Sequence, residues 1–319
     1  MKVSGFVSAF LIGLFSFVMA IGLVIPCEAQ EARKSAAERR VLLKNLIQKE
    51  KYLMVPGVYD AVSARLVEQA GFPVLYIGSY ATAASQYGLP DDGMVNLTQM
   101  VDKARTVVNA TNIPVIGDGE NGFTFAANIW TTVQAFEQAG VSAIHIEDHE
   151  FGKHTDLPKV ILPMEQMVGK IRAAVAARQD PNFLIIARTD IMSATANPDD
   201  AVKRANAYLD AGADMVFPTG MPFDKMKELR SQIKGKVMTT HSTHRGKPAI
   251  EEELARINVV LYYDFALSVA YKAVKSAVEK LKATKDISQL RDTLYNEAEF
   301  ANFIGTPLFV EKVNKFMKK

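Results

Sequence analysis

The sequence predicts a single closed (β/α)8 barrel, the TIM-barrel class, and three observations support this prediction. Eight short β-rich runs recur along the chain, and most of them are continuously apolar. Such runs are typical of parallel strands that are buried on both faces of a sheet. Amphipathic helical segments, such as 164–177 and 201–211, separate the runs. Eight strand–helix units in a chain of 319 residues fit one barrel of ordinary size.

The N-terminal residues 1–29 are predicted to be a separate segment. No charged residue lies between Lys2 and Glu28, and residues 6–25 are nearly all apolar. A basic start, an apolar run and small residues at Cys27 and Ala29 indicate an export signal that is cut after Ala29. The apolar run is also long enough to span a bilayer, so an uncleaved anchor is the alternative. These features predict an exported, periplasmic protein, which is membrane-anchored only if the segment is retained.

Residues 31–51 are rich in Ala, Arg, Lys, Glu and Leu, and they predict a first amphipathic helix. We expect this helix to be a solvated surface helix. No linker rich in Pro, Gly or Ser divides the chain after it. Residues 30–319 are therefore predicted to form one domain.

The predicted strands are 53–58, 74–77, 115–117, 143–147, 184–187, 215–217, 237–240 and 259–263. Three of the helices before them end in Gly71, Gly140 or Gly212, where a left-handed residue closes a helix. A doubly wound open sheet is the alternative fold. It lacks support because no Gly-x-Gly-x-x-Gly pattern follows the first strand.

Composition excludes several classes of protein. Of the residues, 49% are hydrophobic and 23% are charged, with 37 Lys and Arg against 35 Asp and Glu. This balance excludes a disordered tail, a collagen-like repeat and a polybasic nucleic-acid binder. The one cysteine excludes a disulfide framework and a cysteine-rich zinc site. We therefore expect no nucleic-acid partner.

Polar residues gather where the predicted strands end, and that end of a barrel carries the catalytic residues. In strand order they are Tyr59 and Asp60, Gly78 to Tyr80, Asp118 and Glu120, Glu147 and Asp148, Arg188 and Asp190, Thr219, Thr240 and His241, and Tyr263 and Asp264. The set is rich in carboxylates and contains one arginine.

The carboxylates Asp118, Glu120 and Glu147 predict a divalent cation site. Converging carboxylates raise one another's pKa unless a counter-charge is present. Mg²⁺ takes a few carboxylates, water and substrate oxygens, and Mn²⁺ is the alternative. Asp118 and Glu120 are two residues apart, so we expect them on the same side of a straight strand. A polar turn between strand and helix is the simpler interpretation of 118–121.

Arg188 follows the apolar run 183–187, and its planar guanidinium suits a bidentate grip on a carboxylate or phosphonate. A buried salt bridge with Asp190 or Glu147 is the alternative. His241 is a weaker candidate, either for the site or for the surface. Tyr76 and Tyr80 fit packing against the site better than chemistry.

Several fragments, in order, carry a resemblance to a known family. They are Pro56 to Ala61, Ala70 to Phe72, Gly88 to Asp91, Gly117 to Phe123, His145 to Asp148, Ala187 to Asp190 and Ala211 to Pro218. Across residues 51–281 the chain resembles the isocitrate lyase/phosphoenolpyruvate mutase superfamily, particularly its methylisocitrate lyase-like and phosphonomutase-like members.

The resemblance implies a (β/α)8 barrel whose C-terminal helix is swapped between subunits, usually in a homotetramer. It implies Mg²⁺ held largely through water by Asp91, Asp118, Glu120 and Glu147. It implies chemistry through a metal-stabilised enolate of pyruvate. The site residues that it implies are listed by role: catalytic Arg188, Lys153, Thr155 and Asp91, and substrate-binding Tyr76, Gly78, Ser79, Tyr80, Arg188, Thr219 and His241.

Three positions depart from the lyases of this superfamily. Thr155 stands where they carry a cysteine acid, Tyr80 replaces a glycine, and Thr219 replaces a glutamate. A threonine hydroxyl is a far poorer proton donor than a thiol. The hydrolase and mutase members, which have an amide or a hydroxyl near this place, fit Thr155 better.

The sequence therefore predicts a Mg²⁺-dependent lyase that acts on a small 2-oxo acid or related carboxylate and cleaves a C–C or C–P bond. A phosphonopyruvate hydrolase-like or mutase-like activity is one alternative. A catalytically inactive, exported dicarboxylate-binding protein is another.

Overall fold

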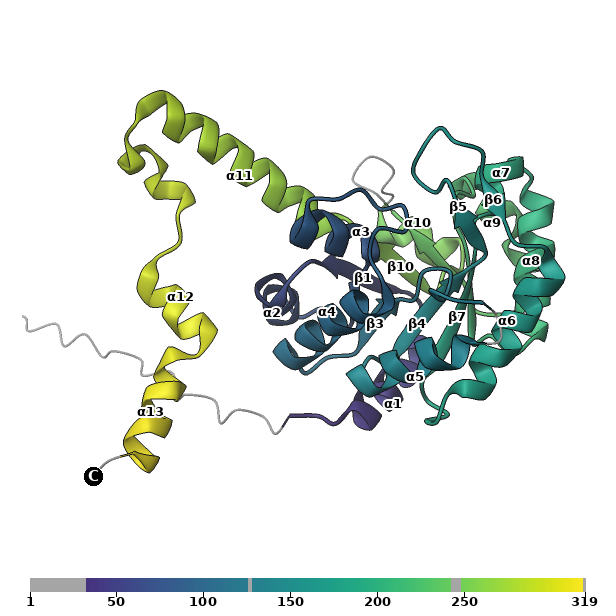
Figure 1. Cartoon of the computed structure of the whole chain (residues 1–319), viewed down its shortest axis with the longest axis horizontal. Coiled ribbons are helices and arrows are strands. Elements are labelled where there is room, and N and C mark those ends of the chain that lie inside the picture. The colour runs from purple at the N-terminus through teal and green to yellow at the C-terminus, as the bar shows by residue number, and fades with distance from the viewer. Residues whose placement is uncertain (1–32, 126–127, 242–247, 318–319) are drawn as a thin grey trace, which may run out of the picture. The chain divides into compact units, whose positions relative to one another are not determined.

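The computed structural model describes residues 33–125, 128–241 and 248–317, and the predicted leader 1–29 lies outside them. Lys34–Lys319 forms one compact unit. Its centre is an eight-stranded parallel sheet in the order β8-β7-β4-β3-β2-β1-β10-β9, with helices on its outer face (Figure 1). A parallel bridge between Val216 and Val237 joins the two end strands. The predicted (β/α)8 barrel is confirmed.

The barrel strands are β1 (Leu53–Val58), β2 (Leu75–Ile77), β3 (Val115–Asp118), β4 (Ala143–Glu147), β7 (Leu184–Thr189), β8 (Met215–Pro218), β9 (Met238–Thr240) and β10 (Val259–Tyr262). Each overlaps one predicted run, in the predicted order. β7 runs two residues further than predicted, because Arg188 and Thr189 still pair with Phe217 and Pro218 of β8. Polar residues therefore continue the strand into the site.

The barrel has two apolar layers, as alternating side chains of a closed sheet require. Inward residues such as Val55, Ile116 and Ile186 pack in the barrel interior. Outward residues such as Ile144, Ile185 and Val216 pack against the helices. Both layers consist of buried apolar side chains, and most polar side chains of the site lie at the strand ends.

The first helix, α1 (Ala36–Lys49), is not the solvated surface helix that we expected. Ser35 and Glu38 form a capping box at its start. Leu43 and Ile47 are buried in the cluster that fills the barrel interior. Arg40 is also buried, and its guanidinium pairs with Asp180 at 3.1 Å. The prediction was wrong because an arginine that is buried by its partners looks, in sequence, like a solvated one.

Outside the barrel, the main helices are α2 (Ala61–Gln69), α4 (Leu97–Ala110), α5 (Ile129–Ala139), α6 (Met164–Ala177), α8 (Pro198–Asp210), α9 (Phe223–Leu229) and α10 (Ala249–Leu254). Short helices α3 (Ser79–Thr82) and α7 (Ile191–Thr195) follow β2 and β7. Gly71, Gly140 and Gly212 have φ of 86°, 89° and 102°, which confirms the predicted left-handed helix ends.

A two-stranded hairpin, β5 (His149–Phe151) and β6 (Val160–Ile161), follows β4 directly. The sequence analysis did not predict it, because its strands are very short and carry no apolar alternation. The loop 152–159 between the two strands brings Lys153 to the strand ends of the barrel.

After β10 the chain forms α11 (Phe265–Thr284), a 3-10 helix (Ile287–Thr293), α12 (Glu297–Ile304) and α13 (Thr306–Phe316). None of the described residues of α11 is buried. Val269, Val274 and Val278 are each about 60% exposed. No described helix is long and apolar enough to cross a bilayer.

Candidate active site

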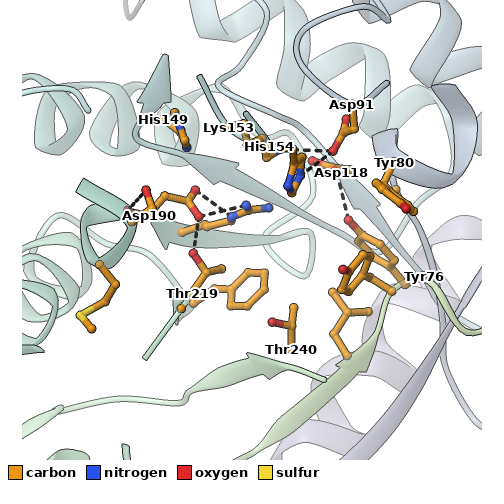
Figure 2. Close-up of a pocket in the computed structure, with 18 residues that line it drawn as sticks. Tyr76, Tyr80, Asp91, Asp118, His149, Lys153, His154, Asp190, Thr219 and Thr240 are labelled. Carbon is orange, nitrogen blue, oxygen red and sulfur yellow. Dashed lines mark hydrogen bonds and ion pairs between the residues drawn. The ribbon is translucent and has the colours of Figure 1, made fainter. Parts of the chain in front are cut away.

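A cavity of about 290 Å³ lies at the carboxyl ends of the barrel strands (Figure 2). Its lining comes from almost every strand–helix junction: Tyr76, Gly78, Tyr80, Asp91, Asp118, His149, Lys153, His154, Arg188, Asp190, Met192, Ser193, Phe217, Thr219, Gly220, Thr240, Leu261 and Tyr263. A volume of this size suits a small metabolite.

Asp118, at the end of β3, is the most heavily hydrogen-bonded carboxylate of the site. Its Oδ2 accepts from the Tyr76 hydroxyl at 3.0 Å, the Ser79 backbone N–H at 3.1 Å and the Ser79 hydroxyl at 3.0 Å. Its Oδ1 accepts from the Glu120 N–H at 2.9 Å. Burial alone would raise the pKa of Asp118, but nearby His145, Lys153 and Arg188 outweigh it and hold the pKa well below its usual range. Asp118 is therefore a fixed, ionised ligand group.

His145 of β4 is the register partner of Asp118 on β3, and its side chain lies beside the Asp118 carboxylate. Its Nε2 lies 2.9 Å from the Tyr76 hydroxyl and 3.6 Å from Asp118 Oδ1. The ring is fully buried, and this burial lowers the pKa of His145 to about 4 against the pull of Asp118. A neutral imidazole therefore shares the tyrosine hydroxyl with the carboxylate. The sequence analysis quoted His145 only as part of a motif.

Glu120 and Glu147 lie beside Asp118 and are bridged by Lys153. The Lys153 ammonium is 3.2 Å from Glu120 Oε2, 3.0 Å from Glu147 Oε1 and 3.9 Å from Asp91 Oδ2. Burial raises the pKa of Glu120 to about 7 even though Lys153 lowers it. Burial also raises the pKa of Glu147 well above its ordinary value, despite Arg188 and Lys153. Additional positive charge at this place would favour the ionised form of both acids.

We expected strand alternation to place Glu120 beside Asp118, and this prediction was wrong. β3 ends at Asp118, and Glu120 has the left-handed φ of 47°. Hydrogen bonds from its N–H to Asp118 and from the Glu147 N–H to its carbonyl hold this conformation. Left-handed backbone at a non-glycine residue is strained and concentrates at functional sites.

The residues fit a hard divalent cation. One ligand atom each from Asp118, His145 and Glu147 lie within 4.8 Å of one another. In the described part of the chain, Glu120 Oε1 is buried and accepts no hydrogen bond. A buried carboxylate oxygen without a partner is costly, and a cation would satisfy it. The carboxylate oxygens suit Mg²⁺ or Mn²⁺, while the Tyr76 hydroxyl already engages His145 Nε2.

Arg188 forms the buried salt bridges with Asp190 and Glu147 that the sequence analysis gave as the alternative. Its guanidinium makes a bidentate pair with Asp190 at 3.0 Å for each contact, and it lies 3.0 Å from Glu147 Oε2. It also stacks over the Phe217 ring, 5.4 Å from its centroid, while it lines the cavity. The Thr219 hydroxyl donates to Asp190. Arg188 is thus an oriented cation on the cavity wall.

The loop 152–159 contributes Lys153 and His154 to the cavity, but not Thr155. His154 Nε2 is 3.2 Å from Asp91 Oδ2, and its ring meets Tyr80 edge-on. The Thr155 hydroxyl donates to the carbonyl of Gly152 at 3.3 Å within its own loop. Thr155 is not among the lining residues, so its catalytic role stays a prediction that this arrangement does not support.

Two other predicted substrate-binding positions differ from expectation. His241 is buried against Glu252 of α10 and does not line the cavity, whereas its neighbour Thr240 does. Ser79 faces the site, but its N–H is already donated to Asp118. Tyr80 is 40% exposed at the cavity edge, where it contacts the Tyr263 ring. The role of each remains a prediction.

The sequence analysis did not propose ten of the lining residues as site residues: His149, His154, Asp190, Met192, Ser193, Phe217, Gly220, Thr240, Leu261 and Tyr263. Asp190, Thr240 and Tyr263 were on the strand-end list, which was the available signal. His154 follows Lys153 directly and could have been found on that ground.

The fold and the site together define a (β/α)8-barrel enzyme with a buried acidic cation site. Residues 43–282 match the profile of the family described as phosphoenolpyruvate phosphomutase. The 2,3-dimethylmalate lyase of Eubacterium barkeri is 34% identical over 271 residues, which cover 82% of this chain and 93% of that protein. The 2-methylisocitrate lyase of Shewanella oneidensis is 31% identical over 283 residues, which cover 86% and 96%.

Among solved structures, a phosphonopyruvate hydrolase complex with oxalate and Mg²⁺ superposes with a TM-score of 0.80 at 26% identity. The superposition covers 88% of this chain and 99% of that chain. The chain belongs to the isocitrate lyase/phosphoenolpyruvate mutase superfamily, as the motifs indicated.

Proposed function

We propose that this protein is a Mg²⁺-dependent lyase that cleaves a C–C bond of a small 2-hydroxy dicarboxylate or 2-oxo acid and releases pyruvate or a close relative. One observation carries the proposal. Asp91, Asp118, Lys153 and Arg188 line one cavity of about 290 Å³. Glu120 and Glu147 adjoin it, because Lys153 contacts both of them and Arg188 lies 3.0 Å from Glu147. The relatives named above act on substrates of this class.

Asp118 and Glu147, with Glu120 and Asp91, would hold the cation, which when bound polarises a substrate oxygen next to the bond that breaks. Arg188 binds a substrate carboxylate, and Asp190 keeps its guanidinium in the plane that this requires. Tyr76 and Ser79 hold Asp118 in one orientation. Lys153 and His154 close the cavity from the loop side and exclude water.

A second candidate is the hydrolysis of a C–P bond in a 2-oxo phosphonate. The single cysteine of the chain is Cys27, so the loop 152–159 has no thiol that could protonate a carbon leaving group. A phosphonate needs no such proton donor at that place. The similarity to phosphonopyruvate hydrolase supports this candidate.

The test is 2-oxo acid release by the purified protein with Mg²⁺. 2,3-Dimethylmalate, 2-methylisocitrate, oxaloacetate and phosphonopyruvate are supplied in parallel, and pyruvate and phosphate are both assayed. We expect pyruvate from a C–C substrate, and its loss on addition of EDTA. Pyruvate with stoichiometric phosphate from phosphonopyruvate alone would establish the second candidate. Thermal stabilisation by one compound without turnover would instead favour a dicarboxylate-binding protein.

We also propose that the protein is exported and that α11 packs against another copy in a homotetramer. The apolar segment 6–25 supports export. The exposed valines of α11 support an assembly, since an apolar helix face of this length is covered in soluble proteins. Mass spectrometry of the protein from periplasmic and membrane fractions would locate it and test cleavage after Ala29.

A further inference from the structure

The Lys153 ammonium lies inside the acidic cluster that we propose for the cation. Its side chain is only 7% exposed, and it contacts Glu147, Glu120 and Asp91 at 3.0, 3.2 and 3.9 Å. These are three of the four carboxylates predicted to hold Mg²⁺. An ammonium and a divalent cation repel each other strongly at such short range in a buried site. The same carboxylate oxygens therefore cannot bind the Lys153 ammonium and the divalent cation equally well at the same time.

The loop that carries Lys153 is held in shape by its own bonds. The Lys159 ammonium donates to the carbonyls of Gly152 and Thr155. The Thr155 hydroxyl donates to the Gly152 carbonyl at 3.3 Å and accepts from the Leu157 N–H at 3.2 Å. All four of these hydrogen bonds lie within the loop itself.

The polar contacts between this loop and the barrel go to acidic residues. Lys153 N–H donates to Asp92 at 3.1 Å, and His154 lies 3.2 Å from Asp91. The ion pairs of the Lys153 ammonium with Glu120, Glu147 and Asp91 add to these contacts. If a bound metal cation neutralised those carboxylates, most of the polar contacts between the loop and the barrel would weaken.

We propose that Lys153 is an internal counter-cation that competes with the divalent cation for the acidic cluster, so that metal binding releases the loop 152–159 from the barrel. The proposal rests on the cation site of the proposed function. Because linkage is reciprocal, a loop held down by Lys153 weakens cation affinity by the same factor. Metal loading then opens the loop side of the cavity before an anionic substrate enters.

The test uses the full-length protein without substrate and measures two quantities. Calorimetric titration gives the Kd for Mg²⁺, and hydrogen–deuterium exchange reports on the loop 152–159. We expect Lys153→Met to bind Mg²⁺ about tenfold more tightly than wild type, because a buried like charge is removed. Lys153→Arg keeps the charge and should stay near wild type. Lys225→Met is the control, since it removes the same charge from an exposed side chain of α9 that does not face the cluster.

In the wild type, Mg²⁺ should accelerate exchange in residues 152–159. In Lys153→Met, exchange should be fast already and insensitive to Mg²⁺. Protection of the loop by Mg²⁺ in the wild type would overturn the proposal without any variant. The proposal would also be overturned if Lys153→Met bound Mg²⁺ no more tightly than wild type, or if Lys225→Met bound it as tightly as Lys153→Met does. If the wild type binds neither Mg²⁺ nor Mn²⁺, the cation site itself fails, and the proposed function falls with this inference.

Discussion

Asp118 is the residue on which the candidate site depends most. Three donors meet its Oδ2, and a fourth meets Oδ1. This network fixes the carboxylate before any ligand arrives, and preorganised charge of this kind is what a metal enzyme uses. Its position could be predicted from the sequence, because Asp118 ends an apolar strand. The donors on Tyr76 and Ser79 could not, since these residues come 42 and 39 positions earlier in the chain.

The first prediction concerns the charge of this carboxylate. Asp118→Asn keeps the shape of the side chain but removes the charge, so cation binding should weaken by at least about a hundredfold, and 2-oxo acid release should fall with it. Titration calorimetry with Mg²⁺ and the pyruvate assay check this. Asp102→Asn, on an exposed side chain of α4, is the control and should leave both unchanged. Wild-type Mg²⁺ affinity in Asp118→Asn would show that the cation lies elsewhere.

The second prediction concerns Gly78, directly after β2. A Cβ built there would lie 2.7 Å from the ring of Tyr76. Gly78→Ala must therefore push Tyr76 away from Asp118, and we expect a loss of about 1–3 kcal/mol in the free energy of unfolding. Urea unfolding and turnover should both report the damage.

Gly169 of α6 is the matched control for this change. A Cβ there meets nothing within 4 Å. Gly169→Ala should raise stability by about 0.5–1 kcal/mol, since alanine is the better helix former. Equal effects of the two substitutions would mean that the contact with Tyr76 is not what constrains Gly78.

At the scale of elements, α1 shows how tertiary contacts redefine a helix. Its sequence has the charge pattern of a surface helix, and its capping box fixes where it begins. Yet its buried stripe, Leu43 and Ile47, belongs to the barrel interior. The helix therefore closes the end of the barrel that lies opposite the site.

The third prediction follows from that burial. Leu43 is fully buried, so Leu43→Ala should cost about 2–5 kcal/mol of stability. Val41 on the same helix is 43% exposed, and Val41→Ala should cost less than about 0.5 kcal/mol. Thermal or urea unfolding of both variants measures the difference. Similar small losses would indicate that α1 is a peripheral helix after all.

The β5–β6 hairpin is the element that the sequence analysis missed entirely. Arg204 of α8 anchors its base, donating to Leu162 at 2.8 Å and to Asp148 at 3.0 Å. Asp148 also accepts from Tyr208 and Thr189, each at 2.7 Å. A buried network thus fixes the two ends of the hairpin while the loop between them is held chiefly by acidic residues.

At the scale of the whole molecule, the helix α11 stands out because nothing in the described chain buries its apolar side chains. This helix of 20 residues has no buried residue in the described chain. The swapped helix and the homotetramer, both predicted from the resemblance, would give its apolar side a partner.

The fourth prediction tests that assembly. Val274 and Val278 lie one turn apart on α11, and each is about 60% exposed. Val274→Asp places a charge on the apolar face and should lower the mass measured by size-exclusion chromatography with light scattering. Ser276→Asp, two residues further along the helix and therefore on a different side, is the control. A monomeric wild type, or equal behaviour of the two variants, would contradict the predicted oligomer.

The sequence by itself determined the barrel, its eight strands in order and the carboxylates at the strand ends. These features follow from local apolar runs and from the rule that parallel strands end on one side of a barrel. Only the tertiary structure decided which polar residues meet. Lys153 and His154 reach the cavity from an unpredicted hairpin, while Thr155 and His241 turn to their own partners. The direction of a side chain is set by long-range packing and pairing, which sequence spacing does not encode.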